Sequence, residues 1–428
     1  MGDSTRTHFD AVVVGAGPAG STVAIQLARA GWSVALIEKQ SFPRRKVCGE
    51  CIAASNWPLL QALGVADAVD ALAGPALRGV TLMHRDRAVA AALPAATHDD
   101  FAWGRALGRE TLDTLLLAQA RSAGADVLQP CTVQAILGTP GAWHCEVRNV
   151  GSPDVLRLRA RVVIDAHGSW EDLPSDRPRR QLARSAADLF AFKANFSGST
   201  LPEGQISVLA LDGGYGGMVV GDQGITTVAC CIRRDRLHEL RGSAPGKSAG
   251  DAVEAWLQRE CAGVSRALHG ARRDGPWLSS GPLEPGVRLD GREGIFRVGN
   301  AAGEIHPILG EGISMALQSA ALLCSHLLGQ RAAAVPEAAV QAEMQRAYVA
   351  AWRRAFSPRL RLAAVFAHLA MRPFGAAGLM TLVRVWPGLL TRGARWGGKV
   401  RSWERAEVGG PAHDNPSLQS PSRAPQVP

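Results

Sequence analysis

The sequence predicts an α/β fold. A Rossmann-like domain of parallel strands is joined to an inserted antiparallel β-sheet domain and a C-terminal helical segment. Three observations support this prediction. The chain opens with an apolar run, a helical pattern and a second apolar run. Between about residues 189 and 235 the periodicity changes to two, which is typical of antiparallel strands. From 360 to 390 the chain is apolar and flanked by arginines.

The first βαβ unit occupies residues 9–39. "FDAVVVG" predicts a buried parallel strand, and "SVALIEK" predicts the next strand. Between them, "PAGSTVAIQLARAG" predicts a helix that ends at Gly31. A second helical pattern runs from Thr111 to Ser122, with Gly124 as its stop.

"GAGPAG", between the first strand and its helix, has the GxGxxG spacing of a dinucleotide-binding loop. Gly15 permits the tight turn, Gly17 lets the backbone approach a pyrophosphate, and Gly20 lets helix and strand pack closely. The helix begins at Pro18 and Ala19, and its positively polarised N-terminus faces the phosphates.

Glu38 ends the second strand about twenty residues after this loop, where a carboxylate binds a ribose diol. A basic loop follows it. Lys39 and Arg45 in this region are further candidates for cofactor binding.

Four alternating segments predict successive strands of the inserted sheet: "LFAFKANF", "QISVLAL", "GGMVVG" and "ITTVACCIRRD". Cys230 and Cys231 are adjacent in the last of these, so their side chains point to opposite faces. "GIFRVGN" then returns to the first domain.

The sequence predicts five regions. Residues 8–185 form the first part of the nucleotide-binding domain, with some substrate-domain strands, and residues 186–290 form the substrate domain. Residues 291–330 return to the nucleotide-binding domain, 331–407 form a C-terminal helical region, and 408–428 form a disordered tail.

The glycine-rich segment "GIFRVGNAAGEIHPILGEGI" identifies the cofactor. It resembles the second flavin fingerprint of the superfamily of aromatic-ring flavin hydroxylases and geranylgeranyl reductases. The resemblance implies FAD, with Pro307 beside the isoalloxazine and a helix N-terminus that stabilises negative charge on the reduced flavin. Asn300 stands where the family has an aspartate. The turn that opens the helix is formed by Gly310, Glu311, Gly312 and Ile313.

Two weaker motifs extend the resemblance from about Phe9 to Leu328. "VVIDAHGSW" matches the family's middle Asp-Gly motif at Asp165, although His167 interrupts it. "LGRETLDTLLLAQARSAGADV" resembles the segment whose arginine contacts the cofactor. Arg109 fits this role, and Arg105 is the second choice.

Three residues are candidates for catalysis. Cys48 in "RRKVCGE" resembles a cysteine near the flavin in the reductase branch; a small residue in a tight loop or a disulfide with Cys51 are the alternatives. Tyr215 lies where the reductases have an aromatic-rich substrate motif, and a hairpin turn is the alternative. His306 is either a proton donor near the flavin or a structural hydrogen-bonding group.

These motifs predict an FAD-dependent oxidoreductase that acts on a lipophilic or aromatic small molecule by hydride transfer to a C=C bond. The alternatives are an NAD(P)H-dependent monooxygenase that hydroxylates a secondary metabolite, and a non-catalytic flavin-binding protein. The tryptophan pair of flavin halogenases is missing. Because the chain has no second GxGxxG, the electron donor is expected to be a transiently bound NAD(P)H or another protein.

The net charge of +9 comes from arginines that are spread along the chain without aromatic interleaving, so nucleic acid is not an expected partner. The eight cysteines are expected to be reduced, and no metal site is predicted. The first residues lack an apolar signal region, and the expected location is cytoplasmic, with membrane association open. For residues 360–390 the alternatives are a helical layer on the substrate domain, peripheral membrane contact and a subunit interface.

Overall fold

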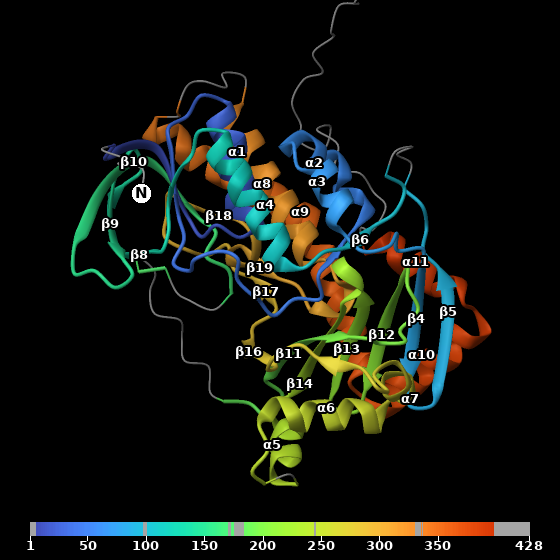
Figure 1. Cartoon of the computed structure of the whole chain (residues 1–428). Coiled ribbons are helices and arrows are strands. Elements are labelled where there is room, and N and C mark those ends of the chain that lie inside the picture. Colours follow the sequence, from blue (N-terminus) through green and yellow to red (C-terminus); the bar gives the residue numbers. More distant parts are fainter. Residues whose placement is uncertain are drawn as a thin grey trace, which may run out of the picture.

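The computed structural model describes residues 6–96, 101–169, 173–174, 184–243, 245–329, 335 and 337–397. The predicted tail of residues 408–428 lies outside the described residues. Two large sheets with separate helical layers make up most of the described chain, and the N-terminal and C-terminal segments each contribute to both halves (Figure 1). The predicted α/β fold is confirmed.

The first sheet is mainly parallel. Its strands are β1 (His8–Val14), β2 (Val34–Ile37), β7 (Asp126–Leu128), β8 (Cys131–Thr139), β9 (Ala142–Asn149), β10 (Val155–Asp165) and β18 (Ile295–Arg297). The order is β7-β2-β1-β10-β9-β8, with β18 also on β10. Strands β7, β2, β1, β10 and β18 run parallel, whereas β8, β9 and β10 form an antiparallel meander.

Three helices pack together beside this sheet: α1 (Pro18–Arg29), α4 (Arg109–Ser122) and α8 (Gly312–Leu328). The predicted βαβ unit and the predicted return of "GIFRVGN" to the first sheet are both confirmed. The carboxyl ends of neighbouring strands are joined directly, since Ala166 N donates to Val14 O and Val298 N donates to Asp165 O. The loops after β1, β10 and β18 therefore meet at one edge, which is where open α/β sheets bind ligands.

The second sheet contains the predicted antiparallel strands. Its members are β4 (Gly79–His84), β5 (Arg87–Ala92), β11 (Leu189–Ser197), β12 (Gln205–Leu211), β13 (Gly214–Val220), β14 (Thr226–Arg233), β15 (Arg272–Arg273) and β16 (Leu278–Leu283). The order is β15-β11-β14-β13-β12-β4-β5, with β16 also on β11. The hairpin β4–β5 joins through a parallel β12–β4 pairing, so the first part of the chain contributes strands to this sheet.

Helices cover both faces of the second sheet. One face packs against α5 (Arg234–Gly242), α6 (Ala249–Glu260) and α7 (Ala262–Ala267); the other lies against the end of α9 (Ala338–Ala370), α10 (Pro373–Val385) and α11 (Gly388–Trp396). Cys230 belongs to the first of these apolar layers and Cys231 to the second. Their predicted opposite orientation is therefore confirmed.

Smaller elements complete the described chain. They are β3 (Cys51–Ile52), β6 (Arg105–Ala106), β17 (Gly286–Val287), β19 (Gly303–Glu304), α2 (Trp57–Leu63), α3 (Ala66–Leu72) and the 3-10 turns η1 (Ala54–Asn56), η2 (Asp222–Gly224), η3 (Gly299–Ala301) and η4 (Pro307–Leu309). In the part of the chain that the structure describes, no single helix is both long and apolar enough to cross a membrane. Helices α9 and α10 reach that length and composition only as a pair, which is bent by 106°.

Candidate active site

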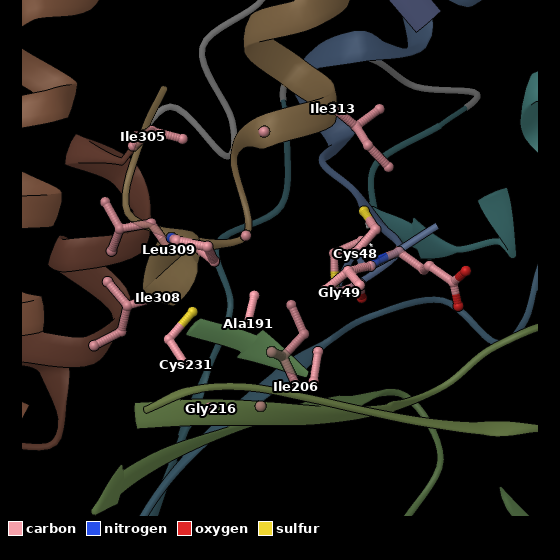
Figure 2. A pocket seen from close by; sticks show the side chains of 18 of the residues that line it. Cys48, Gly49, Ala191, Ile206, Gly216, Cys231, Ile305, Ile308, Leu309 and Ile313 are labelled. Atoms are coloured by element: carbon pink, nitrogen blue, oxygen red, sulfur yellow. Dashed lines mark hydrogen bonds between the residues drawn. The ribbon is translucent and has the colours of Figure 1, made fainter. Parts of the chain in front are cut away.

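A cavity of about 340 Å³ lies between the first sheet's glycine-rich edge, the second sheet and the C-terminal helices. Figure 2 shows the sheet residues Ala191, Ile206 and Gly216 beneath it, Cys48 and Gly49 on one side, and Ile305, Ile308 and Leu309 on the other. Of the residues predicted from the sequence, thirteen line it: Gly15, Gly17, Pro18, Ala19, Glu38, Cys48, Arg109, Tyr215, Asn300, Pro307, Gly310, Gly312 and Ile313.

The glycine loop after β1 has the geometry of a phosphate cradle. Gly15 has a φ of +101°, and a Cβ at Gly20 would lie only 1.8 Å from Gly15 O, so loop and helix can pack this closely only as glycines. Around Gly17 the space is open. A Cβ there would meet nothing nearer than Arg109 Nη2 at 3.7 Å and Arg44 Nη2 at 4.0 Å.

Glu38 holds this loop through its backbone. One carboxylate oxygen accepts from Ala16 N at 3.0 Å and the other from Gln40 N at 3.0 Å. Glu38 is buried and still lines the cavity. The structure thus adds a loop-positioning contact to the predicted ribose-binding role, which stays a prediction.

Three cationic side chains line the cavity beside Gly17: Arg44, Lys46 and Arg109. Arg109 is fixed by two 2.7 Å hydrogen bonds to the Asp113 carboxylate. Burial, together with the positive charges of Arg109 and Arg44, lowers the pKa of Lys46 to about 8. The three positive charges repel one another, and a bound anionic group would reduce this repulsion.

Arg44 leaves part of its hydrogen-bonding capacity unused. Its Nη2 lies 3.7 Å from Glu38 and its Nη1 3.4 Å from Asp113, yet Nε and Nη1 are buried without a hydrogen-bond partner among the described residues. Buried donors of this kind call for an acceptor. The residues present therefore fit a dinucleotide pyrophosphate.

Arg45, a candidate from the sequence, does not line the cavity. Its guanidinium is half exposed and contacts Glu110 Oε2 at 3.1 Å and Asp274 O at 2.9 Å. Lys39 is exposed and also lies outside the lining. Its two neighbours in the chain, Arg44 and Lys46, line the cavity instead. Neither of them was a candidate from the sequence.

The second glycine-rich segment comes into contact with the first. Gly299 has a φ of +60°, and a Cβ there would lie 2.9 Å from Ala19 Cβ. At the start of α8, a Cβ at Gly312 would meet nothing within 4 Å, so the helix N-terminus opens into the cavity. Glu311 is fully buried and is not part of the lining. This geometry fits the predicted flavin-facing helix.

Asn300 belongs to a partly buried chain of polar side chains that no sequence motif indicated. Asn300 Nδ2 donates to Ser169 Oγ at 2.8 Å, and Ser169 Oγ donates to Glu304 Oε1 at 2.9 Å. Arg288 Nη2 contacts Glu304 Oε2 at 2.7 Å. Asn300, Ser169 and Glu304 all line the cavity.

Asp165 is completely buried and lies behind the cavity wall rather than in it. Its carboxylate accepts a hydrogen bond from His167, and Arg297 Nε lies 3.5 Å from it. His167 lines the cavity instead. Asp165 can therefore act on a ligand only by orienting this neighbour.

The loop that carries Cys48 is tied to the second sheet. Glu50, with a φ of 59°, accepts hydrogen bonds from Lys193 Nζ, from Thr227 Oγ1 at 2.6 Å and from Arg109 N at 2.9 Å. The pair Glu50–Lys193 is almost fully buried. It joins residues 143 positions apart, so no local pattern could reveal it.

Cys48 and Cys51 do not form a disulfide, so the disulfide alternative is not present. Cys48 Sγ accepts from Glu50 N at 3.4 Å, and both Cys48 and Arg109 line the cavity. Cys51 Sγ donates to Gly49 O at 3.4 Å. Cys48 is thus placed next to the cationic end of the cavity.

Tyr215 and His306 form a hydrogen-bonded pair at the second sheet. Tyr215 Oη lies 3.2 Å from His306 Nδ1, and only Tyr215 lines the cavity. Burial raises the pKa of Tyr215 well above its usual value, with a further contribution from Cys231. Burial, with the adjacent His368, lowers the pKa of His306 to about 4. The phenol therefore keeps its proton, and His306 is neutral near pH 7.

The far end of the cavity is apolar. Helices α10 and α11 supply four side chains there, and β12 and β14 face them: Leu379, Val383, Leu389, Leu390, Val208 and Cys231. The C-terminal helices thus form a layer packed on the second sheet and cap this pocket, in agreement with the first alternative for residues 360–390.

Comparison with known proteins adds an independent line of evidence. Residues 8–196 match the family described as an FAD binding domain. "Conditioned medium factor receptor 1" of Dictyostelium discoideum is 28% identical over 73% of this chain and 62% of that protein. "Tryptophan 2-halogenase" of Chondromyces crocatus is 26% identical over 79% of this chain and 64% of that protein. The chain thus spans less than two thirds of these two curated relatives.

"Digeranylgeranylglycerophospholipid reductase 1" of Methanopyrus kandleri is 27% identical over 82% of this chain and 87% of that protein. Among solved structures, the myxobacterial chondrochloren halogenase CndH matches with a TM-score of 0.70 and 20% identity, covering 94% of this chain and 95% of that chain. This last likeness shows the fold. Together with the two glycine-rich loops, these matches show an FAD-binding fold, and the proteins to which the chain is similar include a halogenase and a digeranylgeranylglycerophospholipid reductase.

Proposed function

We propose that this protein reduces an activated C=C bond of a lipophilic small molecule. The observation that carries the proposal is one continuous cavity with two different ends. Its cationic, glycine-lined end suits FAD, and its apolar end has a single protonated phenol, Tyr215, in the wall. The similarity to a digeranylgeranylglycerophospholipid reductase supports the same class of reaction.

The cofactor would be held from both sides of the cavity. Arg44, Lys46 and Arg109, with the α1 N-terminus, would bind the pyrophosphate, and the open N-terminus of α8 would face the flavin. Bound FAD, once reduced, supplies a hydride to the substrate. The electron source, NAD(P)H or a donor protein, stays a prediction, and anaerobic mixing with NAD(P)H tests it.

Tyr215 would complete the addition across the double bond. When a hydride adds to one carbon, the electron pair of the broken π bond remains on the other carbon, which takes the Tyr215 Oη proton. His306, in contact with Oη at 3.2 Å, would return a proton from solvent to the phenolate. The raised pKa of Tyr215 keeps it in the donor state before each turnover.

The test uses the purified holoprotein, reduced without oxygen and mixed with lipophilic compounds that carry an activated double bond. A product heavier by two hydrogen atoms supports the proposal, and one heavier by an oxygen atom in air points to hydroxylation. In D₂O the product should carry a solvent deuterium at each of the two former double-bond carbons, because the N–H hydrogen of reduced flavin exchanges with solvent before it is transferred. No reaction with any reducible compound, in a protein whose flavin can be reduced and reoxidised, would contradict it.

Tyr215→Phe should retain FAD and slow turnover by about 10²- to 10⁴-fold, as expected for loss of a general acid. The chain's other tyrosine offers a matched control. Tyr348 is equally buried, but its hydroxyl donates to Arg297 O at 2.6 Å, and it does not line the cavity. Tyr348→Phe should leave the solvent-deuterium content of the product unchanged. Full turnover in Tyr215→Phe would exclude this residue as the proton donor.

A further inference from the structure

Helix α10 exposes apolar side chains on the side that faces away from the protein. Phe374 is 94% exposed, Val385 81% and Leu382 50%. At 100° per residue these three positions lie on one side of the helix, and the buried Ala376, Met380 and Val383 lie on the other. A helix that is apolar all round belongs in an apolar environment on both sides. We call the first side the outer face of α10.

The neighbouring helices carry further exposed apolar side chains. Val365 and Leu369 on α9, which packs against α10, are 58% and 41% exposed. Trp386 follows α10, and Trp396 ends α11; they are 45% and 63% exposed. Tryptophan is enriched at the boundary between lipid and water, because its ring is apolar and its N–H is polar.

The acidic and basic residues of this C-terminal segment have one sign of charge. From Met344 to Trp396 the sequence has nine arginines and no Asp or Glu. Arg372 precedes α10, Arg384 lies at its end, and Arg392 packs over the Trp386 ring at 4.4 Å; all three are exposed. An apolar face on a segment whose ionised side chains are all arginines is complementary to an anionic lipid surface.

We infer that the outer face of α10 docks on an anionic lipid bilayer, with Phe374 and Val385 in the acyl boundary and the arginines at the phosphates. A second copy of this chain fits less well, because a symmetric contact would place the arginines against one another. The 13-residue helix is about 20 Å long, too short to cross a hydrocarbon core of about 30 Å, so the contact is peripheral.

This docking has a consequence for the substrate. Leu379 and Val383 of the same helix line the cavity, so a single layer of helix separates the bilayer from the apolar end. A lipid-dissolved substrate would need only a local movement of α10 to enter. This consequence rests on the proposed function, whereas the docking itself does not, because binding is measured without turnover.

Co-sedimentation of the full chain with vesicles tests the docking. Binding is expected to phosphatidylcholine vesicles that contain phosphatidylglycerol, to weaken as salt rises, and to be much lower with phosphatidylcholine alone. Equal binding to both compositions, or binding to the anionic vesicles that persists at high salt until detergent is added, would overturn the inference.

Two sets of variants locate the contact. Phe374→Ser with Val385→Ser should lower the partition coefficient at least about tenfold, since two large side chains no longer enter the acyl boundary. Arg372→Gln and Arg384→Gln should each lower it about fivefold and flatten the salt dependence. The matched control is Leu137→Ser with Val155→Ser, two exposed apolar residues of β8 and β10 in the first sheet, which should change nothing.

Melting temperature and FAD content show that each variant is folded. Vesicle binding by folded Phe374→Ser/Val385→Ser at the level of the unchanged protein would overturn the inference. So would light scattering that shows a dimer in the unchanged protein and a monomer in this variant, because the outer face would then be covered by a second copy.

Discussion

The two ends of the cavity are built on different principles. At the cofactor end, the contacts come from backbone and from buried ionic groups: the Gly15–Gly20 loop, Arg44, Lys46 and the Arg109–Asp113 pair. At the far end, apolar side chains from the second sheet and from α10 and α11 form the wall. The cofactor end tolerates few substitutions, because an unpaired buried charge or an added Cβ there costs binding free energy. The far end tolerates more, because its apolar side chains can be replaced by others of similar volume.

The largest effect should come from Gly17→Val, which we expect to abolish FAD binding. The added methyl groups would occupy the space beside Arg44 and Arg109, and the protein without cofactor should still fold because only flexible arginine ends lie within 4 Å. Flavin absorbance after desalting measures occupancy. Gly242→Val, at another position with open space around it, is the control. Full flavin occupancy in Gly17→Val would show that this loop does not bind the cofactor.

A bulky residue at the far end should affect the substrate and leave the cofactor. Leu379→Trp fills the apolar end, and overpacking by about 1–3 kcal/mol corresponds to a loss of up to about a hundredfold in kcat/KM. FAD occupancy should be unchanged. Leu382→Trp, on the outer face of the same helix, is the control for turnover of a detergent-dispersed substrate. If Leu379→Trp loses flavin instead, cofactor binding and substrate binding do not belong to separate ends of the cavity.

The pKa of Lys46 makes FAD affinity depend on pH. Below pH 8 Lys46 is charged, and affinity is at its maximum. A bound pyrophosphate raises this pKa, so above pH 8 binding must take up a proton, and the dissociation constant should rise by up to about tenfold per pH unit. Fluorescence titration between pH 7 and pH 9.5 measures it. Lys46→Arg, which stays charged, should remove the dependence, and an unchanged slope in this variant would contradict the assignment.

The smallest effect is expected for Asn300→Asp, which should tighten FAD binding or leave it unchanged. A carboxylate accepts stronger hydrogen bonds from hydroxyl groups than an amide does. Ser169 Oγ can turn from Glu304 to the new carboxylate, while Arg288 keeps Glu304 neutralised. Fluorescence titration with FAD gives the dissociation constants of the variant and of the unchanged protein, which are then compared. A marked loss of affinity would show that Asn300 acts as a donor in the site.

The sequence predicted those features of the fold and of the site that are encoded within one short segment. The βαβ unit followed from one apolar pattern, and the roles of Gly15 and Gly20 from one loop. In the basic loop, Arg44, Arg45 and Lys46 are consecutive and have no periodicity, so the sequence could not tell which of them face the cavity.

Contacts between distant segments were beyond local patterns altogether. Ser169 and Glu304 are 135 positions apart, and their hydrogen bond exists only because the loops after β10 and β18 converge. Helix α9 continues through Pro358, which lacks the N–H that a helix interior needs. Here packing of Trp352 and Phe356 in the main apolar core outweighs a local signal for a break.

The Glu50 anchor bears on how such proteins could be recombined. Because one carboxylate receives Lys193 from β11, Thr227 from β14 and the backbone of Arg109, the flavin-side loop and the second sheet share a buried ionic junction. A chimaera that grafts onto this scaffold a sheet without a cation at the position of Lys193 would leave Glu50 as a buried charge without its counter-ion, which costs several kcal/mol. Exchange of substrate modules must therefore transfer Glu50, Lys193 and Thr227 as one unit.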